Sequence, residues 1–245
     1  MSTTEIAIIL GVSCIAALIK STTGMGYPLV LLPVLALFIS VAEAIVIVAP
    51  SNLVLNSQLT WKMRERHAEA ITLPKFLGGA GVGAVIGTAL LPVLPDRGLR
   101  IVLIVVIVLF LLNRVSPRTF SLSQGHGEQL APFVGTLAGL FQGAAGISGP
   151  IVTPWFLSLN LVRDAYIYAV AMVFALSGVL QIGVLGVQGS FTWSLFLLSM
   201  ALIPIAFTIF PLGAKVRDRI SIVAFERIVL GLLAVSALSL LIKVL

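Results

Sequence analysis

The chain of 245 residues is too apolar for a soluble protein, since 59% of its residues are hydrophobic, 10% are charged and its mean hydropathy is +1.17. So few polar side chains cannot give a globule of this length a hydrated surface, and we therefore expect an integral membrane protein in contact with a lipid bilayer. The net charge of +6 does not indicate a nucleic-acid partner, because the basic residues lie in short loops, where they set the orientation of a membrane protein.

The apolar stretches are continuous rather than alternating, as over residues 101–112, and this favours membrane helices over a β-barrel. The first half of the chain contains residues 4–19, a short segment 29–39, and then 44–61, 71–91 and 99–112. The second half contains residues 130–141, a short segment 151–159, and then 165–187, 191–211 and 222–241. Between the halves lies the longest polar connection, residues 113–129.

The two halves also match each other at fixed points. The matching residues occur in the same order and pair as Pro28 with Pro150, Glu43 with Asp164, Gly87 with Gly213, and Arg100 with Arg227. We therefore predict a first membrane repeat over residues 1–114, a cytoplasmic linker over residues 115–129, and a second membrane repeat over residues 130–245.

The loop charges predict that these repeats are inverted. The connection between the third and fourth segments of the first half is basic, with Lys62, Arg64, Arg66 and Lys75, whereas its counterpart at residues 188–190 is uncharged. The next connection shows the reverse, with Lys215, Arg217 and Arg219 in the second half. Because basic loops remain in the cytoplasm, equivalent loops should lie on opposite sides. The predicted fold is an all-α integral membrane protein with two inverted repeats, each a broken or hairpin helix pair followed by three transmembrane helices.

Each half begins with a break in an apolar helix, STTGMGYPLVLLP at residues 21–33 and GAAGISGPIVTP at residues 143–154. Inside a bilayer such a break is tolerated only where protein or a water-filled cavity satisfies the freed backbone groups. Helices that restart at Pro28 and Pro150 would present N-terminal N–H groups, which favour an anion. The alternative is that the glycines of the breaks only allow close helix packing.

Polar residues near the breaks extend this prediction. Lys20 is the most deeply placed charge of the chain, its equivalent in the second half is Gln142, and Ser21 and Ser148 supply hydroxyls. A cation at membrane depth is costly, so Lys20 should face a cavity or a partner. The alternatives are that Lys20 snorkels to the interface or pairs with Glu43, that Gln142 bonds a neighbouring helix, and that the hydroxyls bond their own helix carbonyls.

Two polar pairs on the facing helices complete the predicted site. Asn52 and Asn56 are four residues apart, as are Ser177 and Gln181, so each pair shares one helix face. The alternative is that these residues only hold the helices together. The candidate substrate-binding residues are Lys20, Ser21, Gly24, Gly26, Asn52, Asn56, Gln142, Gly146, Ser148, Gly149, Ser177 and Gln181.

Two acidic residues at equivalent positions, Glu43 and Asp164, suggest either proton coupling or helix capping. Ser40 and Glu43 have the spacing of a capping box, and Asp164 follows Asn160 at a predicted helix start. This spacing favours the capping interpretation for both carboxylates.

An enzyme is not expected. Residues 146–149 have the G-x-S-G form of intramembrane rhomboid proteases, but no histidine follows Ser148 to serve as its base. The predicted spans contain no paired carboxylates or metal ligands, and a single cysteine, Cys14, cannot form an internal disulfide or a metal cluster. We expect no cofactor and no metal.

The paired breaks, the G-x-x-x-G pattern from Gly83 to Gly87, and the GSFTW run at residues 189–193 resemble the sulfite exporter TauE/SafE family over nearly the whole chain. The sequence departs from the commoner glycine triplet of that family at Tyr27 and in GISGP. The resemblance implies a multi-pass protein of the bacterial inner membrane that transports small anions, often sulfur oxyanions or organosulfur compounds. We expect a secondary transporter that works by alternating access, with a proton or ion as a candidate coupling partner. A passive anion channel and, less favoured, an intramembrane serine hydrolase are the alternatives, and the oligomeric state stays open.

Overall fold

The computed structural model describes residues 2–23, 26–65, 72–115, 122, 124–210 and 222–244. Within these residues every regular element is a helix, which confirms the all-α class. The helices are α1 (Thr3–Thr23), α2 (Tyr27–Leu35), α3 (Val41–Lys62), α4 (Leu73–Ala89), α5 (Asp96–Val115), α6 (Gln124–Ala145), α7 (Gly149–Ser158), α8 (Arg163–Val187), α9 (Trp193–Ile209) and α11 (Ile222–Val244). Helix α6 begins at Gln124, earlier than the predicted residue 130, because the polar residues before the apolar segment are already helical. Gly24, Arg66, Lys215, Arg217 and Arg219 lie outside the described residues.

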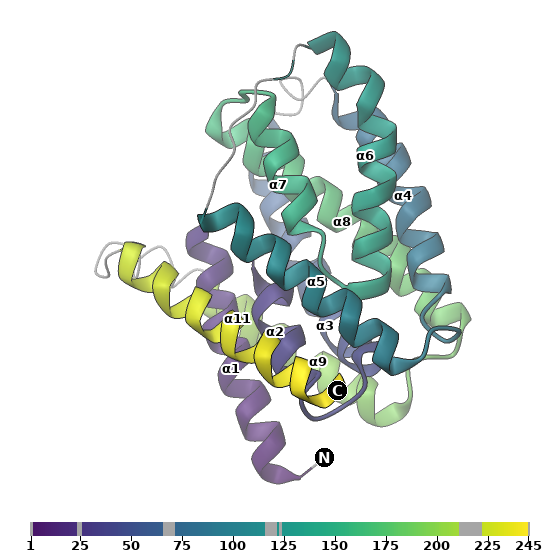
Figure 1. Cartoon of the computed structure of the whole chain (residues 1–245), viewed down its shortest axis with the longest axis vertical. Coiled ribbons are helices and arrows are strands. Elements are labelled where there is room, and N and C mark those ends of the chain that lie inside the picture. The colour runs from purple at the N-terminus through teal and green to yellow at the C-terminus, as the bar shows by residue number, and fades with distance from the viewer. Residues whose placement is uncertain are drawn as a thin grey trace.

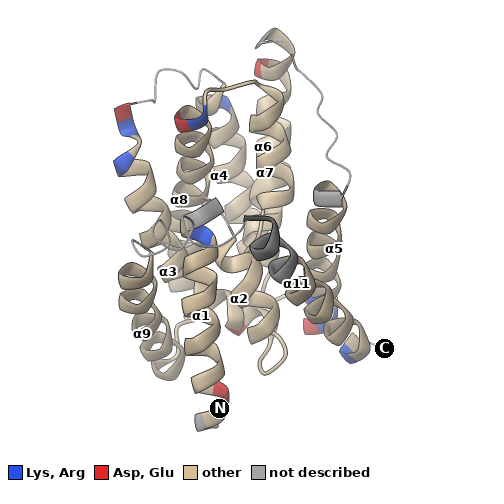
Figure 2. Cartoon of the chain, turned by 90° about the vertical axis from the view of Figure 1, so that its left-hand side faces the viewer, with Lys and Arg blue, Asp and Glu red and all other residues tan. Residues whose placement is uncertain are grey.

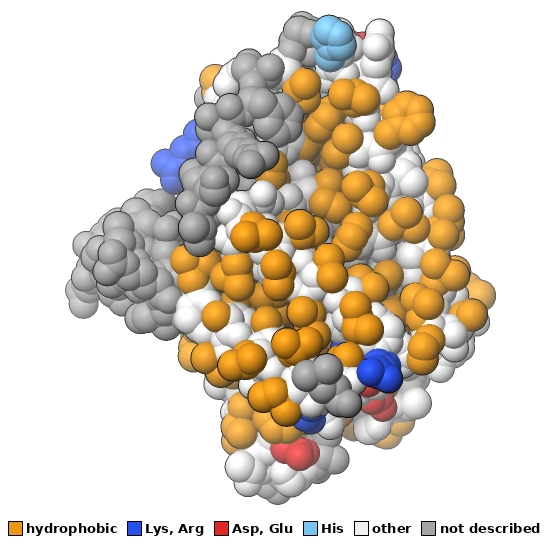
Figure 3. Space-filling model, viewed as in Figure 1, with side chains coloured by type: hydrophobic (Ala, Val, Ile, Leu, Met, Phe, Trp, Pro, Cys, Tyr) orange, Lys and Arg blue, Asp and Glu red, His pale blue; other side chains and the backbone are white. Residues whose placement is uncertain are grey.

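Three helices are long and apolar enough to cross a membrane by length and composition, and they are residues Thr4–Ser21 of α1, α3 and α8. Helices α4, α9 and residues Leu230–Val244 of α11 are shorter apolar helices. Charged residues gather at the two ends of the described helices (Figure 2), and hydrophobic side chains cover most of the described part of the face in Figure 3. This distribution is that of a multi-pass membrane protein, whose apolar side chains face lipid between two polar ends.

The helix breaks lie where the sequence predicts them. Helix α1 ends at Thr23 and α2 begins at Tyr27, after Gly26 with a φ of 108°. Helix α6 ends at Ala145 and α7 begins at Gly149, after Gly146 with a φ of 68°. A positive φ is accessible to glycine without steric cost, so these two glycines allow the chain to turn sharply.

Each short helix folds back along the long helix before it. The Ser13 and Tyr27 hydroxyls lie 2.9 Å apart, which joins the middle of α1 to the start of α2. The backbone N–H of Leu122, just before α6, donates to Ser158 O at the end of α7 at 3.0 Å. The two pairs are therefore helical hairpins, and their short arms turn back inside the bundle (Figure 2).

The long helices α3 and α8 pack against each other in the centre of the bundle. Helix α9 packs on α3, and α4 packs on α8. Helices α5 and α11 lie side by side and cross the front of the bundle in Figure 1, over α2 and α7. The short arms of the two hairpins, α2 and α7, therefore lie between the central helix pair and this outer pair.

The predicted cap at the start of α3 is confirmed. Ser40 Oγ accepts a hydrogen bond from Glu43 N, and Glu43 Oε2 accepts one from Ser40 N at 3.0 Å. Asp164 lies in the first turn of α8, but the residue before the helix is Val162 rather than Asn160, and Val162 forms no side-chain cap. The chain turns at Asn160, with a φ of 52°, before α8 begins, and the capping interpretation of Asp164 stays a prediction.

Helices α4 and α6 form the most extensive packed pair in the described part of the chain. They are parallel, since Gly79 of α4 faces Pro132 of α6 and Gly87 faces Leu140. The six glycines at this contact are Gly79, Gly83 and Gly87 on α4, and Gly135, Gly139 and Gly143 on α6. A Cβ atom on Gly83 would lie 2.1 Å from the Thr136 carbonyl oxygen, so the two backbones are in direct contact.

We predict that Gly83→Ala destabilises the protein by about 1–3 kcal/mol, because the added methyl group forces the two helices apart. Gly78→Ala is the matched control on the same helix, since nothing lies within 4 Å of a Cβ atom there. Thermal unfolding of the two purified variants in detergent, followed by tryptophan fluorescence, measures the difference. Equal unfolding midpoints would show that the α4–α6 contact tolerates a larger residue.

Candidate functional site

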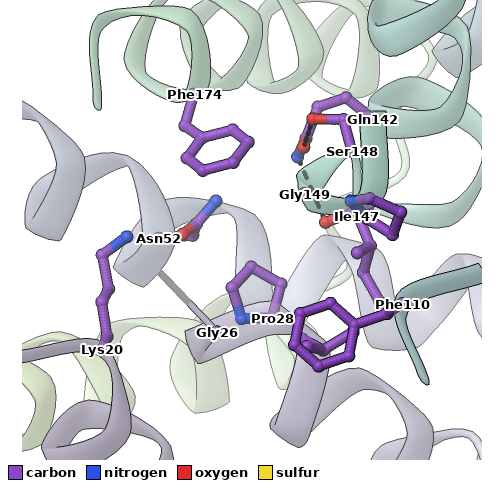
Figure 4. A pocket seen from close by; sticks show the side chains of 13 residues that line it. Lys20, Gly26, Pro28, Asn52, Phe110, Gln142, Ile147, Ser148, Gly149 and Phe174 are labelled. Carbon is purple, nitrogen blue, oxygen red and sulfur yellow. Dashed lines mark hydrogen bonds between the residues drawn. The ribbon is translucent and has the colours of Figure 1, made fainter. Parts of the chain in front are cut away.

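The two helix breaks meet at one cavity in the interior of the bundle (Figure 4). The cavity and its opening to solvent together contain about 360 Å³ of empty space. The cavity is lined by Lys20, Gly26, Pro28, Leu29, Asn52, Phe110, Gln142, Gly146, Ile147, Ser148, Gly149, Pro150 and Phe174.

One wall of the cavity carries a buried lysine held by two asparagines. The Lys20 ammonium is fully buried and donates to Asn56 Oδ1 at 2.7 Å. Asn56 Nδ2 in turn donates to Asn52 O at 2.7 Å and to Asn52 Oδ1 at 2.9 Å. The ammonium also lies 5.8 Å from the centre of the Phe174 ring, within the range of a cation–π interaction.

The opposite wall carries the equivalent position in the second half, Gln142. Its Nε2 donates to Gly146 O at 3.2 Å, and its Oε1 accepts from Ser148 Oγ at 3.0 Å. Gln181 Nε2 donates to Gln142 O at 2.9 Å and to Gly143 O at 3.2 Å. Gln142 O also accepts from the Gly146 N–H at 2.8 Å, so the two glutamine amides supply partners to the Gly143 and Gly146 carbonyls at the break and a second donor to Gln142 O.

The electrostatic environment of the cavity is positive. Lys20 carries the only formal charge among the described lining residues, and none of these residues is acidic. Glu43 bonds Ser40 at the start of α3, about 20 Å along that helix from Asn56. The alternative that Lys20 pairs with Glu43 is therefore wrong, because the two residues belong to opposite parts of the bundle.

Most of the predicted site residues do meet at this cavity. The lining includes Lys20, Gly26, Asn52, Gln142, Gly146, Ser148 and Gly149. Asn56 and Gln181 lie one step behind the wall, where they bond Lys20 and the carbonyl of Gln142.

Three of the predicted substrate-binding residues are not found among the described residues that line the cavity. Ser21 Oγ donates to Leu18 O of its own helix at 2.9 Å, and Ser21 does not line the cavity. Ser177 is fully buried, and its hydroxyl has no hydrogen-bond partner within the described residues. Gly24 falls in the part of the chain that the structure does not describe.

The cavity also contains aromatic residues that the sequence did not identify. Phe174 precedes Ser177 and Gln181 by three and seven residues, so the helical spacing places it on the same face of α8. That spacing could have revealed it, although an apolar residue in an apolar helix is a weak signal. Phe110 of α5 offers no such signal. Asn113 Nδ2, one turn beyond Phe110, donates to Pro150 O at 3.0 Å and so fixes α5 against the second break.

A model of the sulfite exporter TauE/SafE family matches residues 9–240. The chain belongs to the sulfite exporter TauE/SafE family. The resemblance noted in the sequence is thereby confirmed. Family membership makes this TauE/SafE protein a membrane transporter of sulfite or a related small anion, and not an enzyme. Searches among curated proteins and among solved structures gave no match.

The serine hydrolase alternative is therefore wrong, and the site shows how Ser148 is used instead. Ser148 Oγ donates its proton to the amide oxygen of Gln142, which is too weak a base to activate a nucleophile. The hydroxyl fixes the orientation of Gln142 at the second helix break.

We predict that Asn56→Leu lowers the free energy of unfolding by about 1–3 kcal/mol, because it leaves the buried Lys20 ammonium without its acceptor. Lys20→Met removes that ammonium while keeping the length of the side chain. The double variant Lys20→Met/Asn56→Leu should therefore be more stable than Asn56→Leu alone. Thermal unfolding of the four proteins in detergent gives the double-mutant cycle. Additive effects would mean that the two side chains do not stabilise each other.

Proposed function

We propose that this TauE/SafE protein is a secondary transporter that carries a sulfur oxyanion or a small organosulfonate across the bacterial inner membrane by alternating access. The observation that carries the proposal is the cavity between the two helix breaks, with a fully buried lysine on its wall and no acidic residue among the described lining residues. Burying a lysine at membrane depth costs about 2.5–3.5 kcal/mol on insertion scales, and an anionic substrate would offset that cost.

The substrate would bind to several groups at once. Helices α2 and α7 begin at the cavity with a proline in the first turn. In these turns the Val30 N–H already donates to Gly26 O, and the Ile151 and Val152 N–H groups donate to Ser148 O. The Lys20 ammonium and the Asn52 amide are therefore the donors suited to the oxygens of a sulfur oxyanion. The proposed substrate-binding residues are Lys20, Gly26, Asn52, Gln142, Gly146, Ser148 and Gly149, supported from behind by Asn56 and Gln181.

We infer that the two halves, residues 1–114 and 130–245 with a linker at residues 115–129, are inverted repeats. The helix packing supports this, because most of the larger helix contacts have a counterpart when the halves are exchanged. Thus α4 packs on α8 as α9 packs on α3, and α11 packs on α2 as α5 packs on α7. Each half contains a helical hairpin before its long helices, in line with the predicted order.

The glycine contact between α4 and α6 limits how the halves can move. It joins one helix of each half through direct backbone contact, whereas the equivalent pair, α9 and α1, is packed much less extensively. Rocking about the α4–α6 contact would leave it intact and would open the cavity on the side of α1 and α9. We therefore infer that this contact is the pivot of the alternating-access cycle.

Removal of the cation tests the site. We predict that Lys20→Met lowers uptake of radiolabelled sulfite into proteoliposomes about ten- to a hundredfold at subsaturating substrate, because a hydrogen bond to a charged group contributes about 1.5–3 kcal/mol. Lys75→Met is the matched control, since Lys75 is exposed and bonds Glu128 outside the cavity. Lys20→Arg should retain part of the activity.

Unchanged uptake by Lys20→Met would remove Lys20 from the binding site. The same proteoliposomes distinguish a carrier from a passive channel. In a carrier that alternates between two states, unlabelled sulfite trapped inside the proteoliposomes accelerates the uptake of labelled sulfite. In a passive channel, trapped sulfite does not accelerate this uptake. Absence of acceleration would therefore overturn the alternating-access part of the proposal.

Single cysteines test the inverted topology. In a Cys14→Ser background, Arg64→Cys after α3 and Gln188→Cys after α8 are both exposed on the protein surface. We predict that a membrane-impermeant maleimide applied to spheroplasts labels Gln188→Cys and does not label Arg64→Cys until the membrane is permeabilised. The reason is that the basic end of α3 stays in the cytoplasm. Labelling of both cysteines from the same side would contradict the inversion.

A further inference from the structure

The directions of the hydrogen bonds on the lysine wall are fixed by chemistry. An ammonium group can only donate, so the atom of Asn56 that lies 2.7 Å from Lys20 Nζ must be its amide oxygen. The amide nitrogen of Asn56 then points to the backbone oxygen of Asn52, which can only accept, and to the side-chain oxygen of Asn52. The Lys20 ammonium and the backbone oxygen of Asn52 therefore fix which side-chain amide atom is oxygen and which is nitrogen in both asparagines.

This wall consequently presents donors to the cavity. The oxygen of the Asn52 amide is occupied by Asn56, while its NH₂ group makes no hydrogen bond within the described residues. Lys20 has two further N–H groups beyond the one given to Asn56. Asn52 and Lys20 line the cavity and are almost fully buried, so a bound molecule with acceptor oxygens would satisfy these donors.

The opposite wall presents an acceptor. Gln142 Nε2 donates to the backbone oxygen of Gly146, and this directs the Gln142 amide oxygen toward Ser148. The Ser148 hydroxyl lies 3.0 Å from that oxygen and must then donate to it, and Figure 4 marks this hydrogen bond with a dashed line. A hydroxyl has one proton, so Ser148 Oγ can offer only lone pairs to a molecule in the cavity. Ser148 is buried and lines the cavity beside Gly149.

The charge of the walls favours one negative charge. Lys20 is the only formal charge among the described lining residues. The positive N-terminal ends of α2 and α7 are each opposed at the same break by the negative C-terminal end of α1 or α6. The partial charges of the helix ends therefore nearly cancel at each break. A dianion would retain one unpaired negative charge in a poorly solvated cavity, and this is unfavourable.

We propose that the cavity selects a monovalent sulfur oxyanion or sulfonate that carries one O–H or N–H group, which donates to Ser148 Oγ while the oxygens of the anion accept from Lys20 and Asn52. This inference rests on the proposed transport function and specifies its substrate. Fully deprotonated dianions such as sulfate are disfavoured by charge. Monoanions without a donor leave Ser148 Oγ unsatisfied in a buried site, which costs affinity.

Three probes of nearly equal size and fixed charge test this. Sulfamate is a monoanion with an N–H donor, methanesulfonate is a monoanion with a methyl group in that place, and sulfate is a dianion. We expect the wild-type protein in chloride-free buffer to bind sulfamate about three- to tenfold more tightly than methanesulfonate, the effect of one net hydrogen bond. Sulfate should bind most weakly. Isothermal titration calorimetry and the shift of the unfolding midpoint with ligand measure the affinities.

Ser148→Ala should abolish the preference for sulfamate over methanesulfonate, because it removes the acceptor that distinguishes the two anions. Ser158→Ala is the control on the same helix, because Ser158 Oγ bonds Trp155 O within α7 and does not line the cavity. It should leave all three affinities unchanged. Isethionate, which carries its hydroxyl on a two-carbon chain, would bind more tightly than sulfamate if the substrate is an alkanesulfonate rather than an inorganic anion.

Each part of the inference can fail separately. Equal binding of sulfamate and methanesulfonate by the wild-type protein would overturn the donor requirement, whether or not Ser148→Ala folds. Binding of sulfate at least as tight as that of methanesulfonate would overturn the selection for a single charge and leave the transport proposal standing. Failure of all these anions and of sulfite to bind would overturn the proposed function itself.

Discussion

The structure depends on one constraint, namely that backbone polar groups freed by a helix break inside a membrane must find partners within the protein. The second break meets this requirement through Gln181 and Gln142, whose amides donate to the carbonyls of Gln142, Gly143 and Gly146. Such partners are available only in the interior of the bundle. The breaks must therefore lie against the central helices α3 and α8, and the polar residues that satisfy them also line the cavity.

The equivalent residues before the two breaks form different hydrogen bonds, and the difference gives the cavity its polarity. In the second half the neutral Gln142 both donates to a backbone carbonyl and accepts from Ser148. In the first half the equivalent residue is Lys20, which can only donate, so it requires an acceptor from α3, and Asn56 supplies it. One lysine in place of one glutamine thus makes one wall a set of donors with a positive charge, while the other wall keeps an acceptor.

The breaks, Lys20 and most of the polar lining could be predicted from the sequence, because glycine, proline and a charge are energetically expensive in an apolar helix and therefore informative. Phe110 could not, since the sequence does not distinguish an aromatic residue that faces a cavity from one that faces lipid, and Phe174 gave only the weak signal of sharing a helix face with Ser177 and Gln181. The pattern from Gly83 to Gly87 contributed only to the family resemblance, and nothing in it identified α6 as the helix that these glycines contact. The position of Val162 before α8 could not be predicted, because it depends on the turn at Asn160.

The close α4–α6 contact and the different polarity of the two cavity walls together indicate which wall moves in the proposed transport cycle. Gln142 and its neighbour Gly143 belong to α6, which is held against α4 by direct backbone contact. Lys20 belongs to α1, whose contact with α9 is much less extensive. If the halves rock about the α4–α6 contact, the wall that carries the acceptor stays in place and the wall that carries the positive charge moves. The negative charge of the substrate would then remain paired with Lys20 while the opening of the cavity changes sides, so the transported charge stays neutralised as it crosses the membrane.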